Sequence, residues 1–296
     1  MHIYLRKTHD QHLGSGVVFA ILASISFTLM SLTTKFIGHK ASTDMVVCIR
    51  FFISLILILP WVIKHPKDAL TVTEPIKLII RTLFSLLAIA SFFYVLKFIS
   101  LTESLLLNNT SPLFIPFLVW ITHQTKTSYK IWIGVIVGFI GITFVLKPGV
   151  LLLQSASLIG LASGLFTAIA YVMIRTLTKT LPIIQILFYN FLICFCVSAI
   201  FLPFTWRPIS LHVFGLLLIV GVLGLFYQFF STLSIAKAPV RITSSLQLLS
   251  IVFGTLADFL VWKKIPDLIS AAGIVLVILG GIITIYFGQK ELKQKK

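Results

Sequence analysis

Long apolar runs, separated by short polar connections, follow one another along almost the whole chain. A membrane-spanning helix needs about 20 mostly apolar residues, and ten runs fit that requirement. They cover residues 14–36, 44–63, 75–96, 101–122, 129–146, 157–177, 182–204, 209–235, 240–261 and 267–287. The pattern predicts an all-α integral membrane protein of ten transmembrane helices, with tails at residues 1–13 and 288–296.

The composition supports a membrane protein and removes one alternative. Hydrophobic residues make up 58% of the 296 residues and charged residues only 11%, whereas soluble domains carry roughly 25% charged residues. The formal net charge of +16 would suggest nucleic acid in a soluble protein. Here Lys and Arg lie mainly in the short connections, as in positive-inside loops. We therefore expect a lipid bilayer around the chain and no nucleic-acid partner.

Lys and Arg are distributed unevenly between the two sides of the predicted bundle. The tails and every second connection hold about twice as many of them as the remaining connections, and such an excess marks the cytoplasmic side. Both termini are therefore predicted to be cytoplasmic, as an even number of spans requires. Short loops and a phenylalanine-rich composition suggest a bacterial inner (plasma) membrane.

The chain repeats itself weakly but in a consistent order. GVVFAILASISFTLMSLTTKF from Gly16 parallels GLASGLFTAIAYVMIRTLTKT from Gly160, and GVIVGFIGI from Gly134 parallels GIVLVILGGI from Gly273. This predicts two five-helix repeats, at residues 14–147 and 157–287. Because five is odd, the second repeat must cross the membrane inverted, an arrangement typical of secondary transporters with a substrate site near the midplane. The alternative is a chance likeness between hydrophobic spans.

Three stretches carry a likeness to a known family. They are RFFISLILILP at 50–60, the aromatic-rich span and polar turn from Ile80 to Phe114, and the glycine pattern Gly134, Gly138 and Gly141. Together they resemble EamA-type members of the drug/metabolite transporter superfamily, over nearly the whole chain. The resemblance implies a ten-helix inner-membrane carrier of small metabolites, often amino acids or nucleotide-like compounds.

The chain departs from that family at two connections. Relatives often carry a Gly-Glu pair after the fourth and ninth spans, where this chain reads THQTK at 122–126 and WKKIP at 262–266. The fold expectation is unaffected. Any mechanism that uses those two glutamates cannot be transferred to this chain.

The fourth span carries polar residues where hydrocarbon is expected. Asn108 and Ser111 share one helix face, Asn109 lies on another, and Pro112 removes a backbone donor and loosens the preceding turn. Unpaired polar groups are costly in lipid, so these side chains must face the bundle or a wet cavity. Two interpretations stay open: contact with substrate, or hydrogen bonding between helices.

The ninth span is interrupted in the same way. It reads RITSSLQLLS from Arg241, and Ser244 and Gln247 can share one face. Two interrupted spans at corresponding positions of two repeats point to a binding site. We therefore predict that Asn109 and Gln247 orient a polar group of the substrate.

Tyrosines and a glutamine inside the spans are further candidates for substrate contact. Tyr94, Tyr171 and Tyr227 can stack on a planar or apolar moiety, and Gln228 adjoins Tyr227. The alternative is ordinary packing: the chain holds 26 phenylalanines, so most of its aromatic side chains must lie in the core or face lipid.

Charged residues inside spans are rare and often functional. Arg50 and Arg81 either snorkel to water or bind a carboxylate or phosphate of the substrate. Asp258 and Glu103 are the acids through which proton coupling would run, if the carrier is coupled. Facilitated diffusion and exchange are equally compatible with the sequence.

Other chemistry finds little support. Cys48, Cys194 and Cys196 lie in apolar runs, so we expect no disulfide, metal site or cofactor. Motifs of an intramembrane enzyme (HExxH, GxGD, GxSxG) and the ionic ring of a channel do not occur. Small-residue patterns such as Gly160-x-x-x-Gly164 indicate packing within the bundle first and a homodimer second. The prediction is a secondary transporter that moves a small polar metabolite by alternating access.

Overall fold

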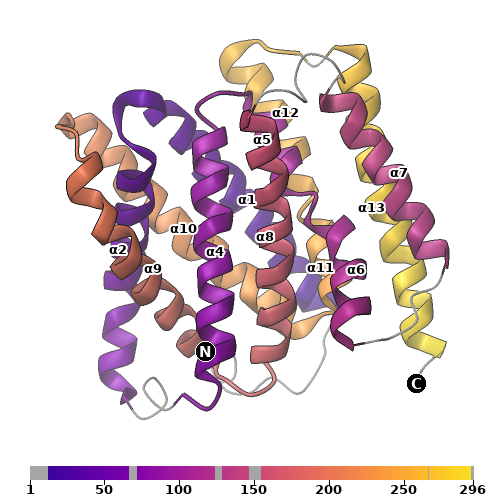
Figure 1. Ribbon diagram of the computed structural model, residues 1–296, viewed down its shortest axis with the longest axis horizontal. Coiled ribbons are helices and arrows are strands. Elements are labelled where there is room, and N and C mark those ends of the chain that lie inside the picture. The colour runs from indigo at the N-terminus through magenta and orange to yellow at the C-terminus, as the bar shows by residue number, and fades with distance from the viewer. Residues whose placement is uncertain (1–12, 67–71, 124–128, 147–154, 266, 295–296) are drawn as a thin grey trace.

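The computed structural model describes residues 13–66, 72–123, 129–146, 155–265 and 267–294. Those residues form helices that stand side by side in one bundle (Figure 1). The helices of the first part are α1 (Leu13–Ile37), η2 (Gly38–Lys40), α2 (Thr43–Lys64), α4 (Pro75–Val95), α5 (Leu101–Asn108), α6 (Ser111–His123) and α7 (Tyr129–Leu146). The second part holds α8 (Ser155–Leu177), α9 (Ile183–Thr205), α10 (Leu211–Lys237), α11 (Val240–Leu246), α12 (Leu249–Trp262) and α13 (Leu268–Gln294).

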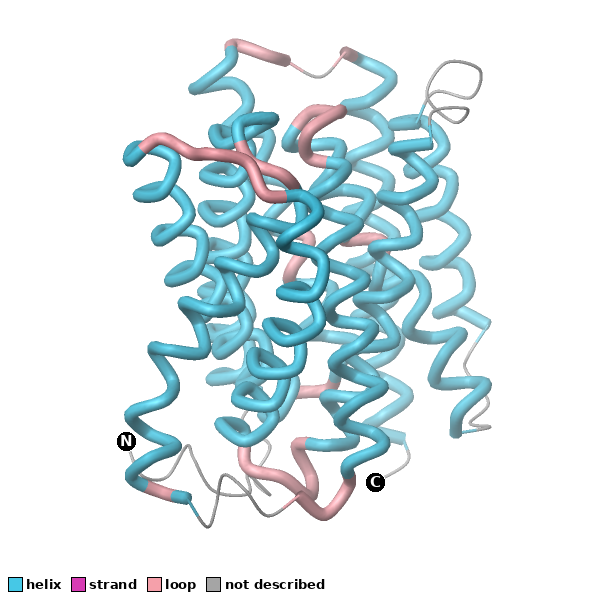
Figure 2. Tube along the Cα trace, turned by 60° about the vertical axis from the view of Figure 1, so that its left-hand side comes forward, coloured by secondary structure: helices cyan, strands magenta, loops and turns pink. Residues whose placement is uncertain are grey.

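The helices confirm an all-α membrane protein. Seven helical stretches of the described part are long and apolar enough to cross a membrane, and two shorter apolar helices cover Tyr129–Phe144 and Leu268–Ile283. Figure 2 shows the helices running between two layers of loops. Many large apolar side chains face outward, among them Phe204 and Leu211, as expected for a surface in lipid. The full count of ten crossings stays a prediction.

The fourth predicted span is broken in its middle. α5 ends at Asn108 and α6 begins at Ser111. The amide of Thr110 donates to Leu107 O at 3.3 Å, a tightened turn in place of a regular helical bond. Pro112 has no amide hydrogen, so it fits in the first turn of a new helix but not in the interior of an old one.

The ninth predicted span is broken at the corresponding place. α11 ends at Leu246 and α12 begins at Leu249. The amide of Gln247 donates to Ser244 O at 3.2 Å, and the amide of Ser250 donates to Gln247 O at 2.9 Å. No proline lies at this break, so polar side chains that compete for backbone bonds are its local cause.

Helices pair across the bundle in a regular way. α2 packs on α9 at one end of the molecule and α7 packs on α13 at the other, with α4 on α8 and α1 on α10 between them. A Cβ at Gly141 would lie 2.6 Å from Gly273 O, and one at Gly280 would lie 2.6 Å from Gly134 O. The glycines of α7 therefore bring it against α13 inside the bundle, as the sequence indicated first. A homodimer stays a prediction.

Candidate substrate site

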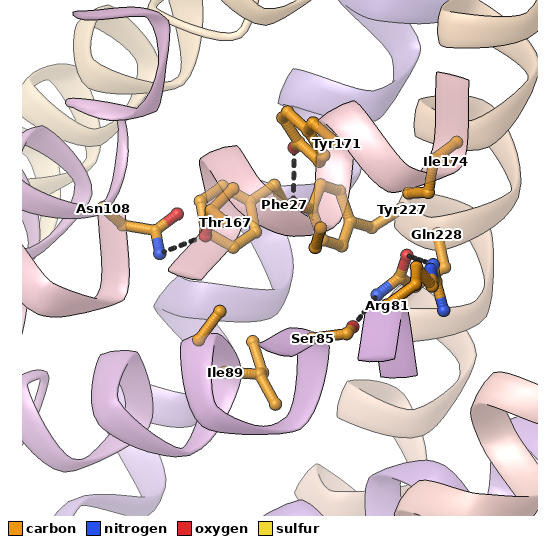
Figure 3. A pocket seen from close by; sticks show the side chains of 12 residues that line it. Phe27, Arg81, Ser85, Ile89, Asn108, Thr167, Tyr171, Ile174, Tyr227 and Gln228 are labelled. Atoms are coloured by element: carbon orange, nitrogen blue, oxygen red, sulfur yellow. Dashed lines mark hydrogen bonds between the residues drawn. The ribbon is translucent and has the colours of Figure 1, made fainter. Parts of the chain in front are cut away.

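A cavity lies in the middle of the bundle, where helices from both parts of the chain meet. Its volume is about 30 Å³, and about 380 Å³ when all the space between its lining atoms and the adjoining open solvent are included. Its polar and aromatic lining comes from α1, α4, α5, α8 and α10: Phe27, Arg81, Ser85, Asn108, Thr167, Tyr171, Tyr227 and Gln228. Figure 3 shows Asn108 and Thr167 at one end, Arg81 and Gln228 at the other, and the aromatic rings between them.

Arg81 makes one end of the cavity cationic. Its side chain is fully buried, and its Nη2 donates to Gln228 Oε1 at 3.4 Å. Gln228 Nε2 in turn donates to Ser85 Oγ at 3.4 Å. The Nε and Nη1 of Arg81 have no hydrogen-bond partner within the described protein. Among the described residues that line the cavity there is no acid.

Arg50 is a second buried guanidinium, on α2. It is 1% exposed, and none of its three side-chain nitrogens has a partner in the described part of the chain. The guanidinium carbon lies 4.8 Å from the ring centroid of Phe51 and 5.7 Å from that of Phe93. Since Arg50 and Arg81 are both buried, neither snorkels to water. Arg50 does not itself line the cavity.

The opposite end of the cavity is polar and uncharged. Asn108 Nδ2 donates to Ser163 Oγ and Thr167 Oγ1, both at 3.2 Å. Those hydroxyls donate to backbone carbonyls of α8, that of Thr167 to Ser163 O at 2.8 Å. Thr167 and Ser163 were absent from the predicted site. Their i, i+4 spacing within an apolar helix was the available signal.

Aromatic side chains form the middle of the cavity. The rings of Phe27 and Tyr227 stack with centroids 4.6 Å apart, and the hydroxyls of Tyr171 and Tyr227 lie 2.9 Å apart. The structure therefore brings Tyr171 and Tyr227 together at the cavity. Tyr94 lies elsewhere: it is 38% exposed, and its ring packs on Phe98 at 4.8 Å.

Asn109 and Gln247 belong to a hydrogen-bond network beside the cavity and do not line it. Asn109 Nδ2 donates to Leu105 O at 2.7 Å and to Ser250 Oγ at 2.8 Å. Ser250 Oγ donates to Gln247 O at 2.7 Å, and Gln247 Oε1 accepts from the Tyr171 hydroxyl. The two helix breaks are thus joined to each other and to Tyr171, an arrangement that fits hydrogen bonding between helices, the second interpretation above.

The remaining predicted polar residues also lie off the cavity. Ser111 is buried at the start of α6, and Ser244 is buried in α11. Neither contributes to the cavity lining. Their role in substrate binding stays a prediction.

The two candidate coupling acids lie at helix ends. Asp258 Oδ2 accepts from the amide of Thr102 at 2.8 Å and from its hydroxyl at 2.7 Å, which ties the end of α12 to the start of α5. Glu103 and Ser100 form a capping box that begins α5. Neither acid lines the cavity, and their role in coupling is untested. Within the described residues, no cluster of His, Cys, Asp and Glu could hold a metal ion.

Comparison with known sequences decides the family. The sequence model of the EamA-like transporter family matches this chain twice, over residues 14–147 and 154–286. The chain belongs to the EamA-like transporter family. These matches cover most of the chain, and with the apolar helices they make it a multi-pass membrane protein of a transporter family.

Relatives of this EamA-like protein are named as transporters. An S-adenosylmethionine uptake transporter of Rickettsia prowazekii is 23% identical over 95% of this chain and 96% of its own. The pseudopaline exporter CntI of Pseudomonas aeruginosa is 27% identical over 91% of this chain and 95% of its own. A crystal structure with 15% identity superposes with a TM-score of 0.70 over 94% of this chain and 99% of the other, which supports the fold. The family and the names of these relatives support a small-molecule transporter.

Proposed function

We propose that this protein is a secondary transporter that moves a small polar metabolite, an amino acid or a nucleotide-like compound, across a bacterial inner membrane by alternating access. The observation that carries the proposal is the buried cavity, which is lined by polar side chains from both parts of the chain. A polar lining is costly in a membrane interior unless it meets a polar ligand or water. The names of the relatives include both an uptake transporter and an exporter, so we leave the direction open.

Helix pairing supports the two inverted repeats that alternating access would use. Suppose that α8, α9, α10 and α13 repeat α1, α2, α4 and α7, respectively. The contact of α1 with α10 is then equivalent to the contact of α8 with α4. The contacts of α2 with α9 and of α7 with α13 each join a helix to its own repeat. The twofold match to one family model points the same way. Pairing of this kind is expected when two halves are related by an axis in the membrane plane.

The cavity extends toward the end of the bundle that is predicted to be cytoplasmic. Arg81 lies in the second turn of α4, and Ile174 lies in the last turn of α8, at the ends predicted to be cytoplasmic. At the other end, Asp258 holds the start of α5 through Thr102. The Lys35 ammonium there donates to Leu96 O at 3.1 Å. Transport would require the contact between Asp258 and Thr102 to open, so that the cavity reaches the outer side.

Uptake into proteoliposomes tests the proposal. We would offer a mixed pool of amino acids, nucleosides and nucleotides and measure by mass spectrometry which compounds enter the lumen, with and without preloading for exchange. Thr167→Ala and Thr143→Ala make a matched pair. Both hydroxyls donate to the carbonyl four residues earlier, but only Thr167 lines the cavity.

We expect at least one polar metabolite to be enriched by the wild type. Thr167→Ala should raise its KM about fivefold, because one hydrogen bond contributes about 1 kcal/mol, and Thr143→Ala should leave KM unchanged. Equal KM values for the two variants would remove the cavity from the substrate route. Absence of any enrichment, also after preloading, would contradict the proposed function.

A further inference from the structure

We propose that the cavity recognises organic anions, with the carboxylate or phosphate of the substrate bound at Arg81 and an uncharged hydrogen-bonding group at Asn108. This inference rests on the proposed function and specifies its substrate class. It also fixes the orientation of the substrate, because the two ends of the cavity differ in charge.

Two buried arginines carry positive charges that no acid in the described lining of the cavity balances. Arg50 and Arg81 are 1% and 0% exposed, and arginine stays protonated in proteins. Five of their six side-chain nitrogens have no partner within the described protein: three on Arg50 and two on Arg81. Buried donors and buried charges are costly when they are unpaired. An anion in the cavity would give acceptors to the two free nitrogens of Arg81 and would offset part of the positive charge of both arginines.

Arg50 and Arg81 would have different roles in binding the anion. Arg50 is held in place, since its guanidinium packs on Phe51 and Phe93 and a Cβ at Gly224 would lie 2.5 Å from its Nε. Arg81 lines the cavity and has a free Nε and Nη1, which lie on different edges of the guanidinium and can each donate a charge-assisted hydrogen bond to an oxygen of an anion. Arg81 would therefore contact the anion. Arg50, which does not line the cavity, would add to the positive electrostatic potential there.

No acid in the described lining competes for the guanidinium of Arg81. Its hydrogen-bond partner is the neutral amide oxygen of Gln228, at the long distance of 3.4 Å. Asp258 is engaged with Thr102 near the end of α12, and it does not line the cavity. A site without a carboxylate of its own favours an anion over a cation.

The far end selects a different group. Asn108 presents an amide and Thr167 a hydroxyl to the cavity, so an uncharged polar group is bound best there. Phe27 and Tyr227 stack between the two ends and offer a flat apolar surface. A substrate that reaches both ends, once the cavity widens to admit it, would carry an anionic head, a planar or apolar middle and a neutral polar tail.

Matched compounds test the class without any substitution. The pool for proteoliposome uptake would contain amino acids beside their amides, and nucleoside monophosphates beside the corresponding nucleosides. We expect the wild type to enrich the member that carries the carboxylate or phosphate at least tenfold over the member that lacks it. Enrichment of carboxylates alone or of phosphates alone would each support the inference and name the anion. Equal enrichment of both members would overturn it while leaving the proposed transporter intact.

Substitutions of Arg81 test the position of the anion. Arg81→Gln keeps hydrogen-bond donors but removes the charge, and Arg81→Lys keeps the charge. Arg207→Gln, at an exposed residue before α10, is the matched control. We expect kcat/KM for the anionic compound to fall at least tenfold in Arg81→Gln, to recover in part in Arg81→Lys and to stay unchanged in Arg207→Gln. An Arg81→Gln variant that elutes as the wild type does and transports at the wild-type rate would overturn the assignment.

Discussion

Gly164 of α8 is the point at which that helix touches the break between α5 and α6. An added Cβ at this position would lie 2.6 Å from Leu107 O and 3.2 Å from Asn108 O, and closer still to Thr110 Oγ1. Real Cβ atoms do not approach a carbonyl oxygen that closely, so Gly164→Ala must push α8 away from the break. The same displacement would separate Thr167 from Asn108, whose side chains meet at 3.2 Å.

The size of the effect follows from what can move. Thr110 Oγ1 donates to Leu107 O at 2.7 Å, so it cannot turn away without losing that bond. The other obstacle is backbone, which moves only with the end of α5. Overpacking costs about 1–3 kcal/mol, and a clash with backbone belongs to the upper part of that range, about 2–3 kcal/mol. Alanine recovers about 1 kcal/mol of helix propensity over glycine. We expect a net loss of stability of about 1–2 kcal/mol, near a 3–6 °C fall in Tm.

Thermal unfolding in detergent measures this loss, with Gly215→Ala as the control. Gly215 lies in α10, and a Cβ there would meet nothing within 4 Å, so that variant should keep or slightly raise the Tm. For a transported compound, Gly164→Ala should also raise KM, whereas Gly215→Ala should not. Equal Tm values for the two variants would refute the close contact between α8 and the broken helix.

The network and the outer contact give two further predictions. Asn109→Ala and Ser250→Ala each break the bond between the helix breaks, so each should lower stability by about 1 kcal/mol and leave KM unchanged; a several-fold rise in KM would return Asn109 to the substrate site. Thr102→Val removes one bond to Asp258, and Asp258→Asn weakens both by removing the charge, so Tm should fall further in Asp258→Asn. Loss of the pH dependence of transport in Asp258→Asn, at an unchanged Tm, would instead assign Asp258 to proton coupling.

The interrupted helices could be predicted from sequence because their cause is local. Asn109, Pro112 and Gln247 each disturb an apolar run, and the structure breaks both helices within a few residues of them. Which neighbour faces the cavity could not be predicted in the same way. Successive side chains point about 100° apart, so either Asn108 or Asn109 must turn to the cavity. Gly164 of α8 packs closely on the break, beside Asn108, and it is Asn108 whose side chain faces the cavity.

The environment of the arginines was beyond the reach of a single sequence for a related reason. Arg50 and Arg81 lie about as far from their helix ends as a guanidinium can reach, so snorkelling and burial fit the sequence equally. Burial is decided by neighbours distant in the chain: Gly224 of α10 packs against Arg50, and Gln228 accepts from Arg81. Tyr94 differs from the two arginines because it is exposed and not buried. Its exposure follows from the arrangement of α4 in the bundle, which the sequence does not specify.

Two basic residues suggest which parts of the molecule stay fixed during transport. Lys35 near the end of α1 donates to Leu96 O, just after α4, and Arg175 near the end of α8 donates to Ile235 O and Ala236 O at the end of α10, at 2.8 and 3.0 Å. In the predicted topology these two contacts lie on opposite sides of the membrane. Each satisfies carbonyls that a helix end leaves unpaired, and each lies just ahead of a broken helix. We therefore expect α5 with α6, and α11 with α12, to move against these anchored ends when the cavity changes sides.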